Sequence, residues 1–212
     1  MTLTSAVCTP TVLDAWHRLA ETDGCSVAAV PENALGWASG LSVVDLTDLP
    51  VFRPEYIRMA WRGKFVRRSK YVRLIDAGAT CALIESVDID AIRQLLGNGA
   101  TLVVNHLEHW HTGVRRVASA LSARAAQPCE AVGFEVFGEE GGFPRHRDPT
   151  DSLVVQLAGR KLWRVWDDGA AGTERSVILT RGNVLRVPAG TDHQVQPEGD
   201  DGSLHLTFAV AP

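Results

Sequence analysis

The stretch Gly142–Trp166, GFPRHRDPTDSLVVQLAGRKLWRVW, indicates the class of fold. Two runs of strand character, residues 152–157 and 161–166, are separated by a glycine turn. His146 and Asp148 precede them at positions i and i+2, so their side chains project to the same side if the backbone is extended. The stretch therefore predicts neighbouring strands that begin beside two side chains of the metal-ligand type.

Similar short runs continue on both sides of this stretch, at a spacing of about ten residues that is typical of antiparallel barrels and jelly rolls. Glycine or aspartate lies in most of the gaps. The further strands that we expect are residues 131–137, 176–179, 183–187, 193–196 and 203–210. The C-terminal half is therefore predicted to be an antiparallel barrel or jelly roll.

The N-terminal half shows helical periodicity instead. We expect helices over Thr9–Glu21, Asp88–Leu96 and Trp110–Ala126, and a short buried strand over Ala100–Asn105. Between the first two helices, a mixed pattern broken by prolines allows short helices over Glu55–Arg62 and Lys64–Arg73.

The composition is that of one ordinary globular domain. A chain of 212 residues with 45% hydrophobic residues is long enough to bury a single large core. The four cysteines show neither a disulfide framework nor zinc-site spacing. The formal charge of −4 gives no overall attraction to nucleic acid or to an anionic membrane, so neither is an expected partner. No signal peptide or membrane span is apparent, which predicts a soluble cytoplasmic protein.

A third candidate ligand, His193, follows 47 residues after His146, beyond the run NVLRVPAGTDH. A strand, a Pro-Ala-Gly turn and a second strand would form a hairpin that returns His193 to His146 and Asp148. Two imidazoles and one carboxylate on one face of an octahedron leave three positions open, as non-haem Fe(II) oxygenases require. Two of these positions take a bidentate 2-oxo acid and the third takes O2.

The sequence around this HxD motif resembles the JmjC-type ribosomal oxygenases of the cupin-like superfamily. Residues 142–166 are similar to that family's glycine-rich approach, HxD, second aspartate, apolar strand ending in Gln and G-R-K-x-W-R turn. The resemblance continues at residues 71–78, 99–104, 182–188 and 203–210. It extends from about Ser42 to the C-terminus, so we expect a JmjC/cupin-like catalytic domain over residues 41–212 and an unassigned N-terminal extension over residues 1–40.

The resemblance implies a mainly β fold with α additions, a double-stranded β-helix of the cupin or jelly-roll type with an N-terminal helical region. It implies a hydroxylase that uses Fe(II), 2-oxoglutarate and O2, with His146, Asp148 and His193 as metal ligands. Lys161 stands where the family has the basic ligand of 2-oxoglutarate, with Arg160 as the alternative, and Thr207 is a candidate hydroxyl partner. There are two competing interpretations: Arg160, Lys161 and Arg164 form a solvated hairpin, and Thr207 is a plain strand residue.

The substrate is less well defined by the sequence. The family's usual Asn and Tyr before the HxD are Val132 and Phe134 here, which predicts a more apolar pocket wall. The chain ends just after the barrel, whereas ribosomal oxygenases continue into further modules, so we expect an amino acid, peptide or small molecule as substrate. A ribosomal or other protein side chain is the alternative, and a non-catalytic cupin-like binding protein is the alternative of a different class. A cupin isomerase would more typically use an HxH pair and a separate Glu.

Several other residues invite an interpretation. His106, His109 and His111 are predicted to lie on the surface rather than to bind metal, and His205 to share the pocket-lining face of Thr207. The basic run Arg58–Arg73 favours a solvated helical face over a nucleic-acid site. Glu135, Glu139 and Glu140 form either an exposed turn or a patch that attracts a cationic substrate.

Overall fold

The fold is a computed structural model that describes residues 9–41, 53–78, 82–138, 140–166, 172–199 and 201–211. Its helices are α1 (Thr9–Ala20), α2 (Ile89–Gly97) and α3 (Thr112–Ala125), with 3-10 turns η1 (Glu32–Ala38), η3 (Pro54–Tyr56), η4 (Arg68–Lys70) and η6 (Leu107–His109). Its strands are β1 (Ser26–Ala29), β2 (Ile57–Trp61), β3 (Lys64–Phe65), β4 (Val72–Asp76), β5 (Leu83–Val87), β6 (Thr101–Val104), β7 (Cys129–Val136), β8 (Phe143–His146), β9 (Asp151–Ala158), β10 (Lys161–Trp166), β11 (Glu174–Leu179), β12 (Asn183–Val187), β13 (Asp192–Pro197) and β14 (Ser203–Val210).

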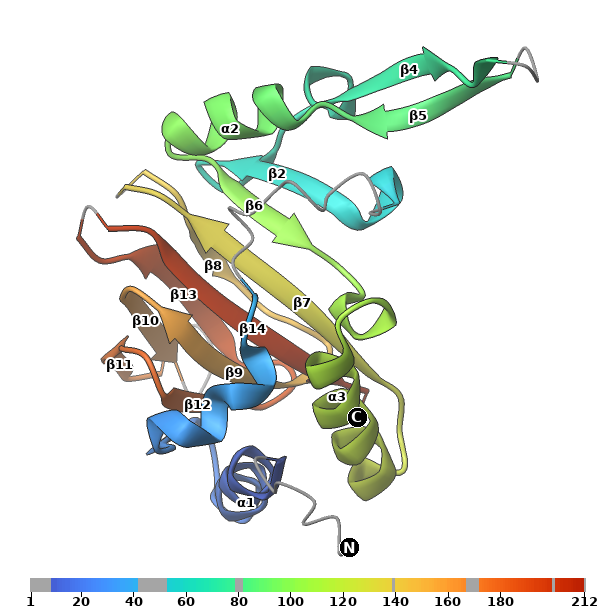
Figure 1. The fold of residues 1–212 in the computed structure, drawn as a ribbon. Helices are drawn as coiled ribbons and strands as arrows, with labels where there is room; N and C mark the ends of the chain where they lie inside the picture. Colours follow the sequence, from blue (N-terminus) through green and yellow to red (C-terminus); the bar gives the residue numbers. More distant parts are fainter. Residues whose placement is uncertain are drawn as a thin grey trace, which may run out of the picture.

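Two antiparallel sheets form the body of the molecule (Figure 1). The large sheet has the order β1-β12-β9-β14-β7-β6-β2-β3, and the small sheet has the order β11-β10-β13-β8. Their inner faces meet in one apolar cluster, in which Val154 and Leu185 of the large sheet pack with Trp163 and Val195 of the small one. The predicted mainly β fold with a cupin-like jelly roll is therefore confirmed.

Helices cover the other face of the large sheet (Figure 1). Alternation along β14 separates the two faces, because Leu206 and Phe208 lie in a core shared with the helices while His205 and Thr207 point into the barrel. α1 contributes Trp16 to this helix-side core, and α3 contributes side chains such as Leu121. The predicted helices at α1, α2 and α3 are thus confirmed. In the part of the chain described, no helix combines the length and apolar composition that a membrane span needs.

The prediction of short helices over Glu55–Arg62 and Lys64–Arg73 is wrong. β2 occupies much of the first range, because Ile57 and Met59 are buried while Arg58 between them is exposed, a period of two that suits a strand beside β6. β2 turns into β3 at Gly63, whose φ of +73° favours glycine and whose added Cβ would lie 2.3 Å from Pro144 Cδ. The basic run Arg58–Arg73 is therefore a set of strands and a 3-10 turn rather than a helical face.

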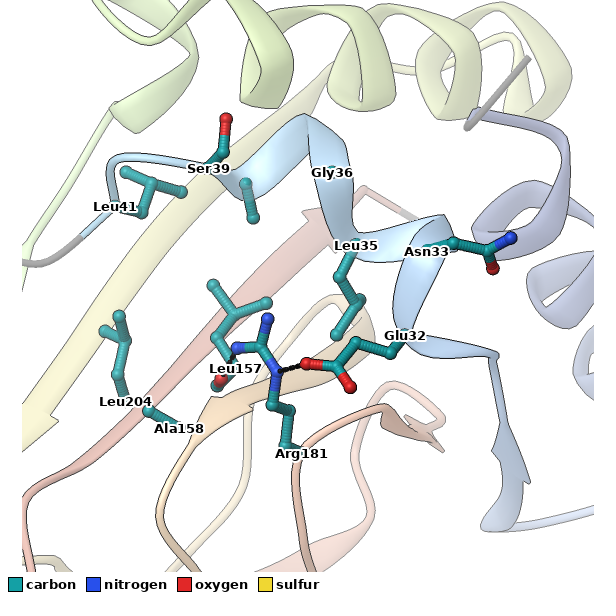
Figure 2. Close-up of a pocket in the computed structure, with 11 residues that line it drawn as sticks. Glu32, Asn33, Leu35, Gly36, Ser39, Leu41, Leu157, Ala158, Arg181 and Leu204 are labelled. Atoms are coloured by element: carbon teal, nitrogen blue, oxygen red, sulfur yellow. Dashed lines mark hydrogen bonds and ion pairs between the residues drawn. The ribbon is translucent and has the colours of Figure 1, made fainter. Parts of the chain in front are cut away.

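The turn η1 covers one end of the large sheet, where it borders a shallow hollow (Figure 2). Ala34 and Leu35 are buried there in the helix-side core. Arg181 joins the turn to the sheet, because its guanidinium lies 3.1 Å from Glu32 Oε1 and donates to the carbonyl oxygen of Leu157. Both charged side chains are largely exposed, so this ion pair contributes little to stability.

Candidate metal centre and cosubstrate pocket

The pairing of β8 with β13 brings the three predicted metal ligands together. His146 is the last residue of β8, Asp148 lies two residues further on, and His193 faces His146 in the antiparallel register. The prediction that β12 and β13 form a hairpin is wrong, however, because these strands lie in different sheets. The turn between them carries the chain from the large sheet to the small one, and the strand pairing of the small sheet then places His193.

The nitrogen and oxygen atoms of this trio converge. His193 Nε2 lies 3.5 Å from Asp148 Oδ2, His146 Nε2 lies 4.0 Å from the same oxygen, and one ligand atom from each residue lies within 4.8 Å of the others. His146 Nδ1 lies 2.7 Å from the carbonyl oxygen of Pro144, and His193 Nδ1 lies 3.0 Å from that of Thr191. Because a carbonyl oxygen only accepts, each Nδ1 carries the proton and each Nε2 keeps a lone pair for a metal.

The electrostatics of Asp148 suit a ligand of this kind. In the metal-free protein, a hydrogen bond with His193 and the charges that His193 and His146 have when protonated lower the pKa of this carboxyl below its usual value, against the opposing effect of partial burial. Asp148 is therefore ionised at neutral pH. Two neutral imidazoles and one carboxylate fit a divalent first-row metal such as iron.

Asp192 ties the strands of this centre together, a role that sequence reasoning missed. Its carboxylate accepts from Arg147 Nε at 2.6 Å and from Arg145 Nη2 at 2.7 Å, while the Arg145 guanidinium also lies 4.1 Å above the ring of Trp166. The two arginines hold the pKa of Asp192 well below its usual range. Asp192 adjoins His193, and the arginines flank His146, so this cluster fixes the two histidines relative to each other. The signal in the sequence was the alternation that puts both arginines on the face opposite His146.

A cavity of about 460 Å³ opens beside the trio. Thr207 and His205 line it, as predicted, and so do Val132 and Phe134, which make its wall apolar. Arg58 and Phe65 of the β2–β3 hairpin lie at the same cavity, with the Arg58 guanidinium 5.5 Å from the Phe65 ring centroid. The basic run thus contributes one cation to the pocket.

Comparison with known proteins relates this centre to a known type of domain. The model of the JmjC domain matches residues 115–177, which include His146 and Asp148. Over this region the chain is similar to JmjC-type ribosomal oxygenases. A NO66 "bifunctional lysine-specific demethylase and histidyl-hydroxylase" of Drosophila sechellia is 26% identical over 138 residues, covering 57% of this chain and 21% of the relative. Human ribosomal oxygenase 1 is 31% identical over 87 residues, covering 32% of this chain and 14% of the relative.

Solved structures share the fold of this chain. The Escherichia coli ribosomal oxygenase YcfD matches with a TM-score of 0.63 at 16% identity, covering 93% of this chain and 51% of YcfD. A structure of YcfD in complex with cobalt and 2-oxoglutarate matches with a TM-score of 0.60 at 15% identity over the same shares. This chain spans about half the length of YcfD and about a fifth or less of the curated relatives described above.

Lys161 is buried, at 2% exposure, so its interpretation as part of a solvated hairpin is wrong. Its Nζ lies 2.9 Å from the carbonyl oxygen of Phe134 and 2.7 Å from His205 Nδ1. Lys161 is not among the side chains that line the cavity, whereas His205 and Phe134 are. Lys161 therefore lies directly behind the cavity wall, with His205 in front of it.

Burial also sets the charge state of this region. It lowers the pKa of Lys161 to about 7, with Glu135 opposing the shift, and it lowers the pKa of His205 well below its usual value. Burial likewise raises the pKa of Glu135 to about 7, so its interpretation as an exposed turn residue is wrong. Of the other two glutamates, Glu140 pairs with Arg62 at 3.0 Å, and Glu139 lies outside the described residues. His205 is therefore neutral, and its Nδ1 accepts a hydrogen bond from protonated Lys161.

Proposed function

We propose that this JmjC domain is an Fe(II)- and 2-oxoglutarate-dependent oxygenase whose metal is held by His146, Asp148 and His193. The convergence of two Nε2 atoms and one ionised carboxylate at the edge of the barrel cavity carries the proposal. Backbone carbonyls hold both histidines in the tautomer that a metal needs. The relative YcfD, whose fold this chain shares, has been solved with cobalt and 2-oxoglutarate.

Bound iron, together with 2-oxoglutarate and O2, supplies the oxidising power to place an oxygen atom on an unactivated C–H bond. The chain's own residues supply binding, orientation and exclusion of water. The cluster of Asp192 with its two arginines keeps the histidines in place, and the apolar side chains of Val132 and Phe134 keep water from the wall beside the reacting carbon.

Lys161 and His205 together provide the cationic end of the cosubstrate pocket in this proposal. A buried dicarboxylate needs a positive partner, because an unpaired charge in an apolar cavity is costly. Lys161 supplies that charge from behind the wall. Since its ammonium donates to His205 Nδ1, the neutral His205 ring carries its proton on Nε2 and can donate it to a carboxylate. The Thr207 hydroxyl, on the same face of β14, is the second donor.

The substrate that we propose is an amino acid, peptide or small molecule that is hydroxylated. The apolar wall and the single cation of Arg58 at the cavity suit a compact group with apolar carbons to oxidise. A ribosomal-protein side chain is the second candidate, favoured by the similarity to ribosomal oxygenase 1 and YcfD.

The experiment is incubation with Fe(II) and 2-oxoglutarate against amino acids, peptides and intact ribosomal subunits, read by mass spectrometry. We expect a gain of one oxygen on one member of the panel, abolished in Asp148→Ala. A metal-dependent shift on one ribosomal protein would select the second candidate. If 2-oxoglutarate binds but no substrate or cosubstrate is turned over, the domain is a binding protein and the proposal fails.

A further inference from the structure

A second group of metal-ligand side chains lies away from the proposed iron site. His106, Glu108 and His109 are on or beside η6, the turn between β6 and α3, and they line a surface hollow together with Glu130 of β7. None of the first three residues lines the barrel cavity. Sequence spacing alone favoured surface histidines, but the fold brings Glu108 between them and Glu130 beside them.

The ligand atoms of this group have separations that suit a metal. His106 Nδ1 lies 3.2 Å from Glu108 Oε1, and His109 Nε2 lies 3.5 Å from the same oxygen. One ligand atom from each of the three residues lies within 4.8 Å of the others. A tetrahedral zinc ion with bonds of roughly 2.0–2.1 Å places its ligand atoms about 3.3 Å apart. The two separations to Glu108 Oε1 differ from this by a few tenths of an ångström.

Outer contacts orient these side chains as they do in metal sites. In the metal-free protein, His106 Nδ1 donates to Glu108 Oε1 at 3.2 Å, and a bound metal would displace this proton. His106 Nε2, which lies 3.6 Å from Glu130 Oε1, would then carry the ring proton. Glu108 Oε2 accepts from the backbone amide of Ala131 at 2.8 Å, which turns Oε1 toward the histidines. The two imidazole rings are stacked, with centroids 5.0 Å apart, and Tyr56 packs against both. In many metal sites a carboxylate accepts a hydrogen bond from a histidine that binds the metal through its other nitrogen, and Glu130 and His106 have this arrangement.

We propose that His106, Glu108 and His109 form a second metal site, which takes Zn²⁺ or a similar divalent transition ion and leaves a fourth position for water. Two nitrogen ligands and one oxygen ligand match the preference of such ions over Mg²⁺ and Ca²⁺, which select oxygen. Cys129 also lines the hollow, but its sulfur is not among the ligand atoms that lie within 4.8 Å of one another. The occupied site would connect the η6 turn to β7 through the contacts of Glu108 and Glu130.

The test counts zinc per chain in metal-stripped protein that has been dialysed against Zn²⁺. We expect two ions in the wild type and one in the double variant His106→Ala/His109→Ala. Asp148→Ala should also bind one, because it removes the other site. The matched control is His17→Ala, since His17 pairs with Glu21 at 3.5 Å on exposed helix without a third ligand, and it should bind two. The proposal does not rest on the oxygenase assignment, because Asp148→Ala separates the two sites.

Two further measurements do not require the double variant, which could be unstable. Glu130→Gln removes the outer carboxylate without changing the size of the side chain, and it should weaken binding at the second site by roughly 10- to 100-fold. The spectrum of bound Co²⁺ in Asp148→Ala should show the intense bands of tetrahedral coordination. No zinc bound by Asp148→Ala, as many ions in the double variant as in the wild type, an unchanged affinity in Glu130→Gln or an octahedral cobalt spectrum would each overturn the proposal.

Discussion

Replacing Lys161 by methionine tests how the cosubstrate pocket is built. The change keeps most of the buried volume and removes one ammonium, which now lies 2.7 Å from His205 Nδ1 and 2.9 Å from the carbonyl oxygen of Phe134. A hydrogen bond that involves a charged group contributes about 1.5–3 kcal/mol. The affinity for 2-oxoglutarate should therefore fall by about 10- to 150-fold.

The pH dependence of binding adds an independent readout. The pKa of Lys161 is lowered to about 7 in the free protein, and its protonated form is the one that attracts a dicarboxylate. Cosubstrate affinity should therefore fall as the pH rises through about 7, and Lys161→Met should remove this dependence. Anaerobic titration of the Fe(II)-loaded protein with 2-oxoglutarate, followed by calorimetry between pH 6 and pH 9, measures both effects.

The control is Arg160→Met, which removes a neighbouring cation that lies on the surface beside Glu198. It should leave the affinity unchanged. If Lys161→Met binds 2-oxoglutarate as tightly as the wild type at every pH, the reasoning is refuted. His205→Ala in combination with Lys161→Met should lose less affinity than the sum of the two single changes, because the two side chains act in series.

Three further changes extend the account. Thr207→Val removes a hydroxyl from the cavity and should weaken 2-oxoglutarate binding by about 2- to 13-fold, as a neutral hydrogen bond of about 0.5–1.5 kcal/mol predicts; an equal affinity in calorimetry would make Thr207 a plain strand residue. Asp192→Asn should weaken Co²⁺ binding at the iron site by roughly 10- to 100-fold without unfolding the chain, whereas Glu198→Gln, at another arginine pair, should not. Glu135→Gln should become more stable relative to the wild type as the pH rises from about 5 to about 7.5, by up to about 3 kcal/mol in urea unfolding. The wild type loses stability over this range because its Glu135 carboxyl, with a pKa raised to about 7, ionises later in the folded state than in the unfolded state. A constant difference between the two proteins across this range would contradict the burial of Glu135.

The sequence predicted those features that depend on local pattern. β10, β12 and β14 have the bounds that alternation and turn residues indicated, and the spacing of His146 and Asp148 correctly placed both at one edge of the barrel. Such patterns are informative because a half-buried strand must alternate and its turns need glycine or aspartate.

Other features depend on contacts between distant residues, which a single sequence does not reveal. The strand nature of Ile57–Trp61 follows from its pairing with β6, and its short apolar run was compatible with helix and strand alike. The position of His205 between Lys161 and the cavity depends on the pairing of β14 with β7, which places the His205 ring beside Phe134. The approach of Glu130 to His106 likewise needs the packing of η6 against β7.

The central claim is that His146, Asp148 and His193 hold an iron ion that couples 2-oxoglutarate to O2. The most direct measurement is succinate formed from 2-oxoglutarate in air by the Fe(II)-loaded protein, followed by nuclear magnetic resonance and compared with Asp148→Ala. We predict steady succinate formation by the wild type, stopped by removing either Fe(II) or O2, and none by Asp148→Ala. Equal succinate formation by the two proteins, or none by a wild type shown to contain iron at this site, would contradict the account.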